Sequence, residues 1–127
     1  MLSYAEQKLS VDLVGCKSMA QLIVRTEKYQ QKFNRDIIVG RGWDQSLWGD
    51  KEMPNYDALN VAFPTTPVCL YRIDGHALLA NKAMLDLAGI TENTKVEGGI
   101  IHLLNGKPSG ILVDNAMNLV IKKIPDY

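Results

Sequence analysis

The segment "PVCLYRIDGHALLANKAMLDLAG", from Pro67 to Gly89, decides the fold class. Its first part, up to Asp74, is apolar at consecutive positions, and strands that are apolar on both faces belong to parallel sheets covered by helices. From His76 onward the apolar residues recur at helical spacing, so the sequence predicts a helix that ends at Gly89. The segment therefore predicts one strand and helix unit of an α/β fold.

The residues before this segment repeat the same alternation of strand and helix. Residues 10–15, "SVDLVG", form a short alternating run suited to a strand, and Ser18 then caps a helix of about four turns that continues to Phe33. Residues 36–44, "DIIVGRGWD", predict a buried strand that leads into a loop, and residues 55–63 predict a short helix. This order is typical of α/β folds with right-handed crossovers.

The pattern changes after Thr91. "GGIIHLL" and "ILVDN" flank an Asn105-Gly106 pair, which predicts a β-hairpin at about residues 97–114. A last helix is predicted from residue 116 until Pro125 stops it. We therefore expect residues 1–127 to form a single α/β segment with parallel strands, crossover helices and an inserted hairpin.

The composition limits the classes of protein and partner. The chain has 127 residues, 46% of them hydrophobic and 22% charged, which is typical of a soluble globular domain. No stretch approaches the roughly 20 consecutive apolar residues of a membrane helix. Fourteen basic residues balance fourteen acidic ones, so no overall field favours nucleic acid or an anionic membrane. Cys16 and Cys69 are expected to be buried, reduced thiols in a cytoplasmic protein.

Polar side chains cluster behind both predicted buried strands, in "GRGWDQSLWG" and in "RIDGH". Because the carboxyl ends of parallel strands meet at one edge of a sheet, these clusters predict a ligand site there. His76 is a candidate acid-base group, since histidine exchanges protons at physiological pH. Asp74 could accept a substrate hydrogen bond, hold His76 in one tautomer, or simply cap the helix that follows. A sharp turn at Gly75 predicts a positive φ.

The remaining candidates each have a purely structural alternative. Trp43 and Asp44 could form an apolar pocket wall with one polar group, although a tryptophan at a strand end more often serves packing. Asn81 lies in an apolar stretch and could bind substrate, although bracing of the neighbouring loop is the favoured interpretation. His102 alternates with apolar neighbours on a predicted strand, so it should face solvent.

Three stretches of this chain resemble one family in sequence and in order. They are "IIVGRGWDQSLW", "PVCLYRIDGHALLANKAMLDLAGI" and "VEGGIIHLLNGKPSGILVDNAMNLV". With their framework of glycine, tryptophan, aspartate, histidine and asparagine, they resemble the amidohydrolase superfamily, in the branch with YtcJ-like proteins and N-substituted formamide deformylase. The similarity runs from about Leu9 to the end of the chain.

The resemblance implies a (β/α)₈ barrel that hydrolyses an amide-type C–N bond of a small molecule. Family members activate water with a divalent metal, which is expected to be zinc, held by a His-x-His pair and by ligands on later strands. This chain has no His-x-His pair, and its two histidines are His76 and His102. We therefore expect an internal fragment without metal ligands, whose parent protein holds the metal. A zinc site made of the two cysteines and two histidines is not expected, because their spacing contains no close pair.

The resemblance also suggests roles for the candidate residues. His76 and Asp74 are assigned to catalysis, and Trp43, Asp44, Gly75 and Asn81 to substrate binding. The alternative is a free-standing, non-catalytic α/β binding or interaction module, because the chain lacks a complete catalytic set. We expect the parent protein to be a metal-dependent hydrolase acting on C–N bonds, and this chain alone to be inactive. Isolated barrel strands would leave unpaired edges, so we expect self-association.

Overall fold

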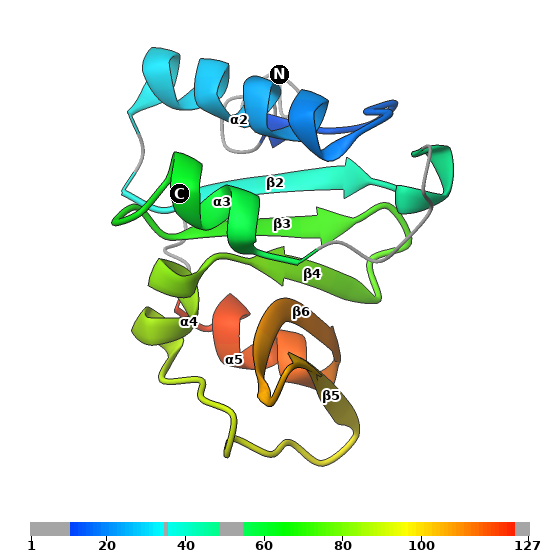
Figure 1. The fold of residues 1–127 in the computed structure, drawn as a ribbon, viewed down its shortest axis with the longest axis vertical. Helices are drawn as coiled ribbons and strands as arrows, with labels where there is room; N and C mark the ends of the chain where they lie inside the picture. Colours follow the sequence, from blue (N-terminus) through cyan, green and yellow to red (C-terminus); the bar gives the residue numbers. More distant parts are fainter. Residues whose placement is uncertain (1–10, 35, 49–54, 124–127) are drawn as a thin grey trace.

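The computed structural model describes residues 11–34, 36–48 and 55–123, which form an α/β structure built on one six-stranded sheet (Figure 1). The strands lie in the order β1-β2-β3-β4-β6-β5. Their bounds are β1 (Val11–Asp12), β2 (Ile38–Trp43), β3 (Val68–Arg72), β4 (Ala77–Ala80), β5 (Gly99–Leu104) and β6 (Lys107–Asp114). The helices are α2 (Met19–Phe33), α3 (Asp57–Ala62), α4 (Lys82–Ala88) and α5 (Asn118–Ile121), with 3₁₀ turns η1 (Gln45–Leu47) and η2 (Asn115–Met117).

The first three strands form the parallel part of the sheet. β1 pairs with β2 and β2 with β3, both in parallel, and α2 and α3 are the connections between them. α2 begins where the sequence predicted, because the Ser18 side chain accepts the Gln21 amide at 3.1 Å. It ends at Asn34, whose φ of 47° places it in the left-handed region. The predicted parallel strands and crossover helices are confirmed for this part.

The second part of the sheet is antiparallel, which corrects the prediction of a helix from His76. Residues Ala77–Ala80 form β4, which pairs antiparallel with β3 on one side and with β6 on the other. Leu78 and Leu79 are both completely buried, in the cores on opposite faces of the sheet, and the opposed side chains of a strand allow this. The helix begins only at Lys82, with Asn81 as its cap.

The turn between β3 and β4 is therefore a hairpin and not the start of a helix. Gly75 has a φ of 75°, so the predicted positive φ is confirmed. A β-carbon at this position would meet nothing within 4 Å, so the backbone conformation alone favours glycine here.

The predicted hairpin around Asn105 is confirmed, and it extends the main sheet. Asn105 and Gly106 have φ values of 55° and 81°, as a tight turn with two left-handed residues requires. β6 pairs with both β5 and β4, so the hairpin completes the antiparallel part. The predicted last helix is shorter than expected and consists of η2 and α5, while its end at Pro125 lies outside the described residues.

Two hydrophobic cores lie on the two faces of the sheet. Alternation along the strands sends Leu70 and Ile111 into the core under α2 and α3, while Cys69 and Leu112 enter the core with α4 and α5. Figure 1 shows α2 and α3 beside the parallel strands and α4 and α5 beside the antiparallel ones. Within the described ranges no helix is long and apolar enough to cross a membrane.

One face of the parallel strands carries a polar row. Asp12, Arg41 and Tyr71 are neighbours in the strand register across β1, β2 and β3. Asp12 and Arg41 are exposed, and the Arg41 guanidinium lies 6.0 Å from the centre of the Tyr71 ring. The opposite face of the same strands is buried under α2 and α3. The parallel part is thus covered by helices on one face, while the other face is mixed: Asp12 and Arg41 are exposed, but Cys69 is completely buried in the core with α4 and α5.

Candidate functional site

The two polar clusters that the sequence placed behind buried strands lie side by side. Trp43 and Arg72 are partners in the register of β2 and β3, and the Ile73 amide donates to the Trp43 carbonyl at 2.9 Å. Parallel pairing brings both carboxyl ends to one edge of the sheet, although the second leads into a hairpin. The expected convergence of "GRGWD" and "RIDGH" is therefore observed.

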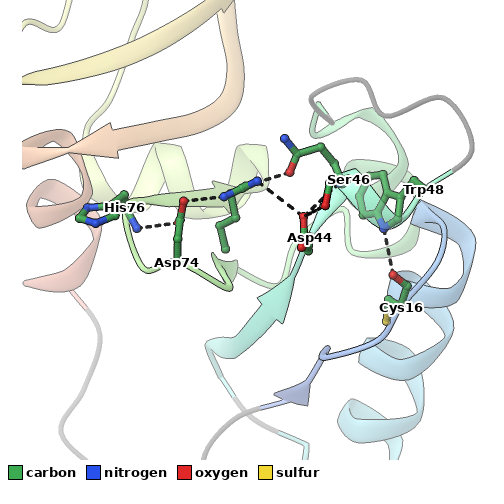
Figure 2. A network of polar contacts seen from close by, with 8 residues as sticks. Cys16, Asp44, Ser46, Trp48, Asp74 and His76 are labelled. Carbon is green, nitrogen blue, oxygen red and sulfur yellow. Dashed lines mark hydrogen bonds and ion pairs between the residues drawn. The ribbon is translucent and has the colours of Figure 1, made fainter.

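Arg72 connects the two clusters through its guanidinium group. One terminal nitrogen bonds the Asp74 carboxylate, the other lies 3.6 Å from Asp44 Oδ1, and Nε donates to Gln45 Oε1 at 2.8 Å. The guanidinium also lies 6.0 Å from the centre of the Trp43 ring. Figure 2 shows this network, with the labelled carboxylates of Asp44 and Asp74 on either side of it. Sequence analysis missed Arg72, although its position two residues before Asp74 offered a signal.

Both carboxylates of the network are stabilised in their charged form. Asp44 Oδ1 accepts the Ser46 hydroxyl at 2.6 Å and the Ser46 amide at 3.0 Å, and these bonds, together with the nearby Arg72, lower the pKa of Asp44. Asp74 Oδ1 accepts the His76 amide at 2.9 Å, and this bond and Arg72 lower the pKa of Asp74. Asp74 therefore bonds the backbone of a hairpin turn, and its predicted alternative role as a helix cap is wrong.

His76 is the most exposed member of the cluster. Its side chain is 77% accessible, and Nδ1 lies 3.7 Å from Oδ1 of Asp114, a residue that sequence analysis did not single out. Its backbone is held on both sides, because the His76 amide donates to Asp74 and the His76 carbonyl accepts the Asp114 amide at 3.0 Å. Figure 2 shows His76 beyond Asp74, at the far end of the network from Asp44. The imidazole can therefore reach a molecule that approaches this edge of the sheet.

Trp43 and Asn81 lie beneath the surface of the described residues. Trp43 is completely buried, and its indole nitrogen donates to the Leu70 carbonyl at 2.7 Å. Asn81 is also completely buried: Oδ1 accepts the amides of Val68 and Met84 at 2.9 and 3.0 Å. Its Nδ2 donates to the Phe63 and Thr66 carbonyls, each at 2.9 Å. These contacts match the structural alternatives to substrate binding, which are packing for Trp43 and bracing of the neighbouring loop for Asn81. Neither side chain lies at an open surface of the described residues.

The described residues do not form a set of metal ligands. Among them, no group of three or more histidine, cysteine or acidic side chains could hold a metal ion. Both cysteines are free and buried, and burial raises the pKa of Cys69 to about 12. His102 is exposed, and its Nδ1 lies 2.8 Å from the Ser109 hydroxyl.

Sequence comparison identifies the class of protein. The profile of the Amidohydrolase family matches residues 3–126, so the chain belongs to the amidohydrolase family. The Bacillus subtilis (strain 168) protein YtcJ, which is named as an amidohydrolase, is 33% identical over 128 residues, an alignment that covers 98% of this chain and 24% of that relative. The Arabidopsis thaliana protein LONG AFTER FAR-RED 3 is 41% identical over 85 residues, covering 65% of this chain and 14% of the relative.

Two solved structures are similar in fold as well as in sequence. An uncharacterized metal-dependent hydrolase from Pyrococcus horikoshii OT3 has a TM-score of 0.70 and 30% identity, covering 96% of this chain and 22% of its own. Another from Pyrococcus furiosus has a TM-score of 0.71 and 29% identity, covering 94% of this chain and 22% of its own. The chain thus spans about a quarter or less of the length of the relatives it matches.

Proposed function

We propose that this chain forms one wall of the active site in a longer metal-dependent amidohydrolase that hydrolyses a C–N bond of a small amide. The observation that carries the proposal is the convergence of Asp44, Arg72, Asp74 and His76 at one edge of the parallel strands. Loops at the carboxyl ends of parallel strands are where α/β enzymes place their catalytic groups. Membership of the amidohydrolase family supplies the reaction class.

We also propose that β1, β2 and β3 are consecutive strands of a (β/α)₈ barrel. In such a barrel the helices cover the outside, while the other face of each strand points inward. The parallel strands here have that asymmetry, with a buried core under α2 and α3 and a polar row that includes Asp12 and Arg41 on the other face. The likeness to two metal-dependent hydrolase structures supports the same arrangement.

The metal would be held by residues outside the described part of this chain, because the described side chains do not form a ligand set. We propose a divalent ion, zinc in the first instance, which when bound supplies an activated water for hydrolysis. The part assigned to this chain is the positioning of the amide substrate and proton transfer by His76. Asp74 fixes the His76 backbone, and Arg72 keeps the two loops together.

The exposed groups are the ones assigned to substrate contact. His76, Asp74 and the open backbone of Gly75 face outward, and Asp44 lies across the network from them. Trp43, at the carboxyl end of β2, contributes by bonding the Leu70 carbonyl of β3. Asn81 lies at the opposite end of β4 from His76 and braces the start of β3. A free-standing binding module is the weaker alternative, because the family match extends over nearly the whole chain. The two free cysteines support the proposal of a cytoplasmic protein.

The test is the replacement His76→Ala in the longer protein that contains this sequence. Turnover of its amide substrate should fall by about 10²-fold or more while the bound metal stays in place, as expected for a lost proton-transfer group. His102→Ala is the matched control, because His102 is also exposed but lies on the β5–β6 hairpin. Unchanged turnover in the His76 variant would overturn the assignment. Stoichiometric zinc in the 127-residue chain would overturn the placement of the ligands elsewhere.

A further inference from the structure

Asp114 has the most unusual backbone of the described residues around the site. Its φ of 52° and ψ of −125° lie in a region that residues with a side chain rarely adopt. Asn34 also has a positive φ, but its ψ of 60° places it in the ordinary left-handed well that asparagine tolerates. Asp114 therefore carries a strain that is not typical of a simple turn.

The surroundings hold Asp114 in this conformation. Its amide donates to the His76 carbonyl at 3.0 Å, and the next amide, of Asn115, donates to the Gly98 carbonyl at 3.3 Å. Asn115 Nδ2 also donates to the Glu97 carbonyl at 3.1 Å. β5 approaches so closely that a β-carbon on Gly99 would lie 2.2 Å from the Ala116 amide nitrogen. A strained residue persists when its neighbours fix it from several sides, as they do here.

The register of β4 and β6 places the Asp114 carboxylate beside His76. Ala77 and Val113 are partners in the β4–β6 register, so His76 and Asp114 form the next cross-strand pair, with Nδ1 and Oδ1 3.7 Å apart. An ordinary cross-strand ion pair would explain the contact, but the two side chains are 77% and 57% accessible. Such exposed pairs contribute little to stability. Glycine would make the same turn without strain, so stability alone does not account for an aspartate here.

We propose that Asp114 is a positioning residue that fixes the tautomer and orientation of His76. A ring nitrogen with a bare lone pair would be repelled by the carboxylate, whereas an N–H group is attracted to it. The proton of the neutral ring therefore sits on Nδ1, facing Asp114, and Nε2 keeps its lone pair toward solvent. This orientation leaves Nε2 ready to accept a proton.

Asp74 is the other acidic neighbour that interacts electrostatically with His76. Asp74 uses one carboxylate oxygen for the His76 amide and the other for Arg72. Asp114 is therefore the acidic side chain of the described residues that faces Nδ1. The inference rests on the proposed role of His76 in proton transfer. It adds to the proposed site Asp114 of β6, which lies thirty-eight positions after His76 in the chain.

The experiment measures the ring nitrogens of His76 by NMR in the ¹⁵N-labelled chain, under alkaline conditions that leave histidine neutral. We expect His76 to be mainly protonated on Nδ1 in the natural sequence. In Asp114→Ala it should return mainly to the Nε2-protonated form that free histidine prefers. His102 in the same spectrum is the internal control, because its Nδ1 contacts Ser109 and should not change. An unchanged His76 tautomer in the Asp114→Ala variant would overturn the proposal.

A second variant separates the carboxylate from the strain. Asp114→Gly removes both, so it should lose the His76 tautomer preference and yet unfold at a higher urea concentration than the Asp114→Ala variant and the natural chain. Lower stability of the glycine variant would contradict the strain argument. None of these readouts requires metal or substrate. If His76→Ala leaves turnover of the longer protein unchanged while the tautomer still depends on Asp114, the proposed catalysis fails and the positioning stands.

Discussion

Replacing Asn81 with alanine tests whether this buried amide serves the fold, as its contacts indicate. The change leaves the buried amides of Val68 and Met84 without their shared acceptor. Loss of the cap on α4 costs about 1 kcal/mol, and a buried amide without a partner costs about 1–3 kcal/mol more. Two carbonyls, of Phe63 and Thr66, lose a donor as well. We therefore expect a loss of about 3–4 kcal/mol in the free energy of unfolding.

Urea unfolding followed by circular dichroism measures this loss. With a slope of about 2 kcal/mol per molar urea, the midpoint should fall by about 1.5 M or more. Asn60→Ala is the matched control, because Asn60 Oδ1 accepts the Lys82 amide at 2.7 Å at the start of the same helix but at an exposed site. Water can replace that bond, so the control should lose less than about 1 kcal/mol. Equal midpoints for the two variants would refute the bracing role.

Three further predictions concern other parts of the chain. Burial raises the pKa of Cys69 to about 12, so its thiol should resist thiol reagents until the protein unfolds. Because the thiol of the unfolded chain ionises near 9, the free energy of unfolding should fall as pH rises from about 9 toward 12. The His76 amide and Arg72 lower the pKa of Asp74. The ionised carboxylate therefore stabilises the fold at pH values above about 4, the ordinary pKa of an aspartate, and this stabilisation is lost as pH falls through the lowered pKa. Asp74→Asn should therefore flatten acid unfolding curves, and an unchanged curve would contradict the network. The edge strand β5 exposes Ile100, Leu103 and Leu104, so the chain should self-associate. Leu103→Lys should weaken this assembly, and a clean monomer of the natural chain in light scattering at micromolar concentration would argue against self-association.

Local signals in the sequence predicted the elements whose chemistry is local. Ser18 and Gln21 identified the start of α2, because a cap and its partner lie within one helical turn. Asn105 and Gly106 identified the β5–β6 turn, because few residues adopt a positive φ at both positions. The parallel strands were predicted from consecutive apolar residues, as burial on both faces requires.

The helix predicted at His76 failed because residues 77–80 are apolar at every position. Such a run satisfies a helix face and a strand buried on both faces equally well. The deciding contact is with β6, about thirty residues later, and no short-range pattern reports it. Asp114 was missed for the same reason, since its contact with His76 is set by the pairing of β4 and β6. Arg72 had a local signal in Asp74, but its contacts with Asp44 and Gln45 depend on the pairing of β2 and β3.

The hairpin at Gly75 changes how the site is coupled to the rest of the chain. At the start of a helix, His76 would depend mainly on its own turn, and the β5–β6 hairpin would be a peripheral insertion. His76 instead directly precedes β4, and its carbonyl accepts the amide of Asp114 on β6, which β5 holds in turn. Arg72 on the neighbouring strand is bonded to Asp74 and lies close to Asp44. A shift of β6 at Asp114 would therefore move the His76 imidazole relative to the parallel strands, so the Asp114 end of the hairpin, remote from its Asn105-Gly106 turn, positions the proposed catalytic group.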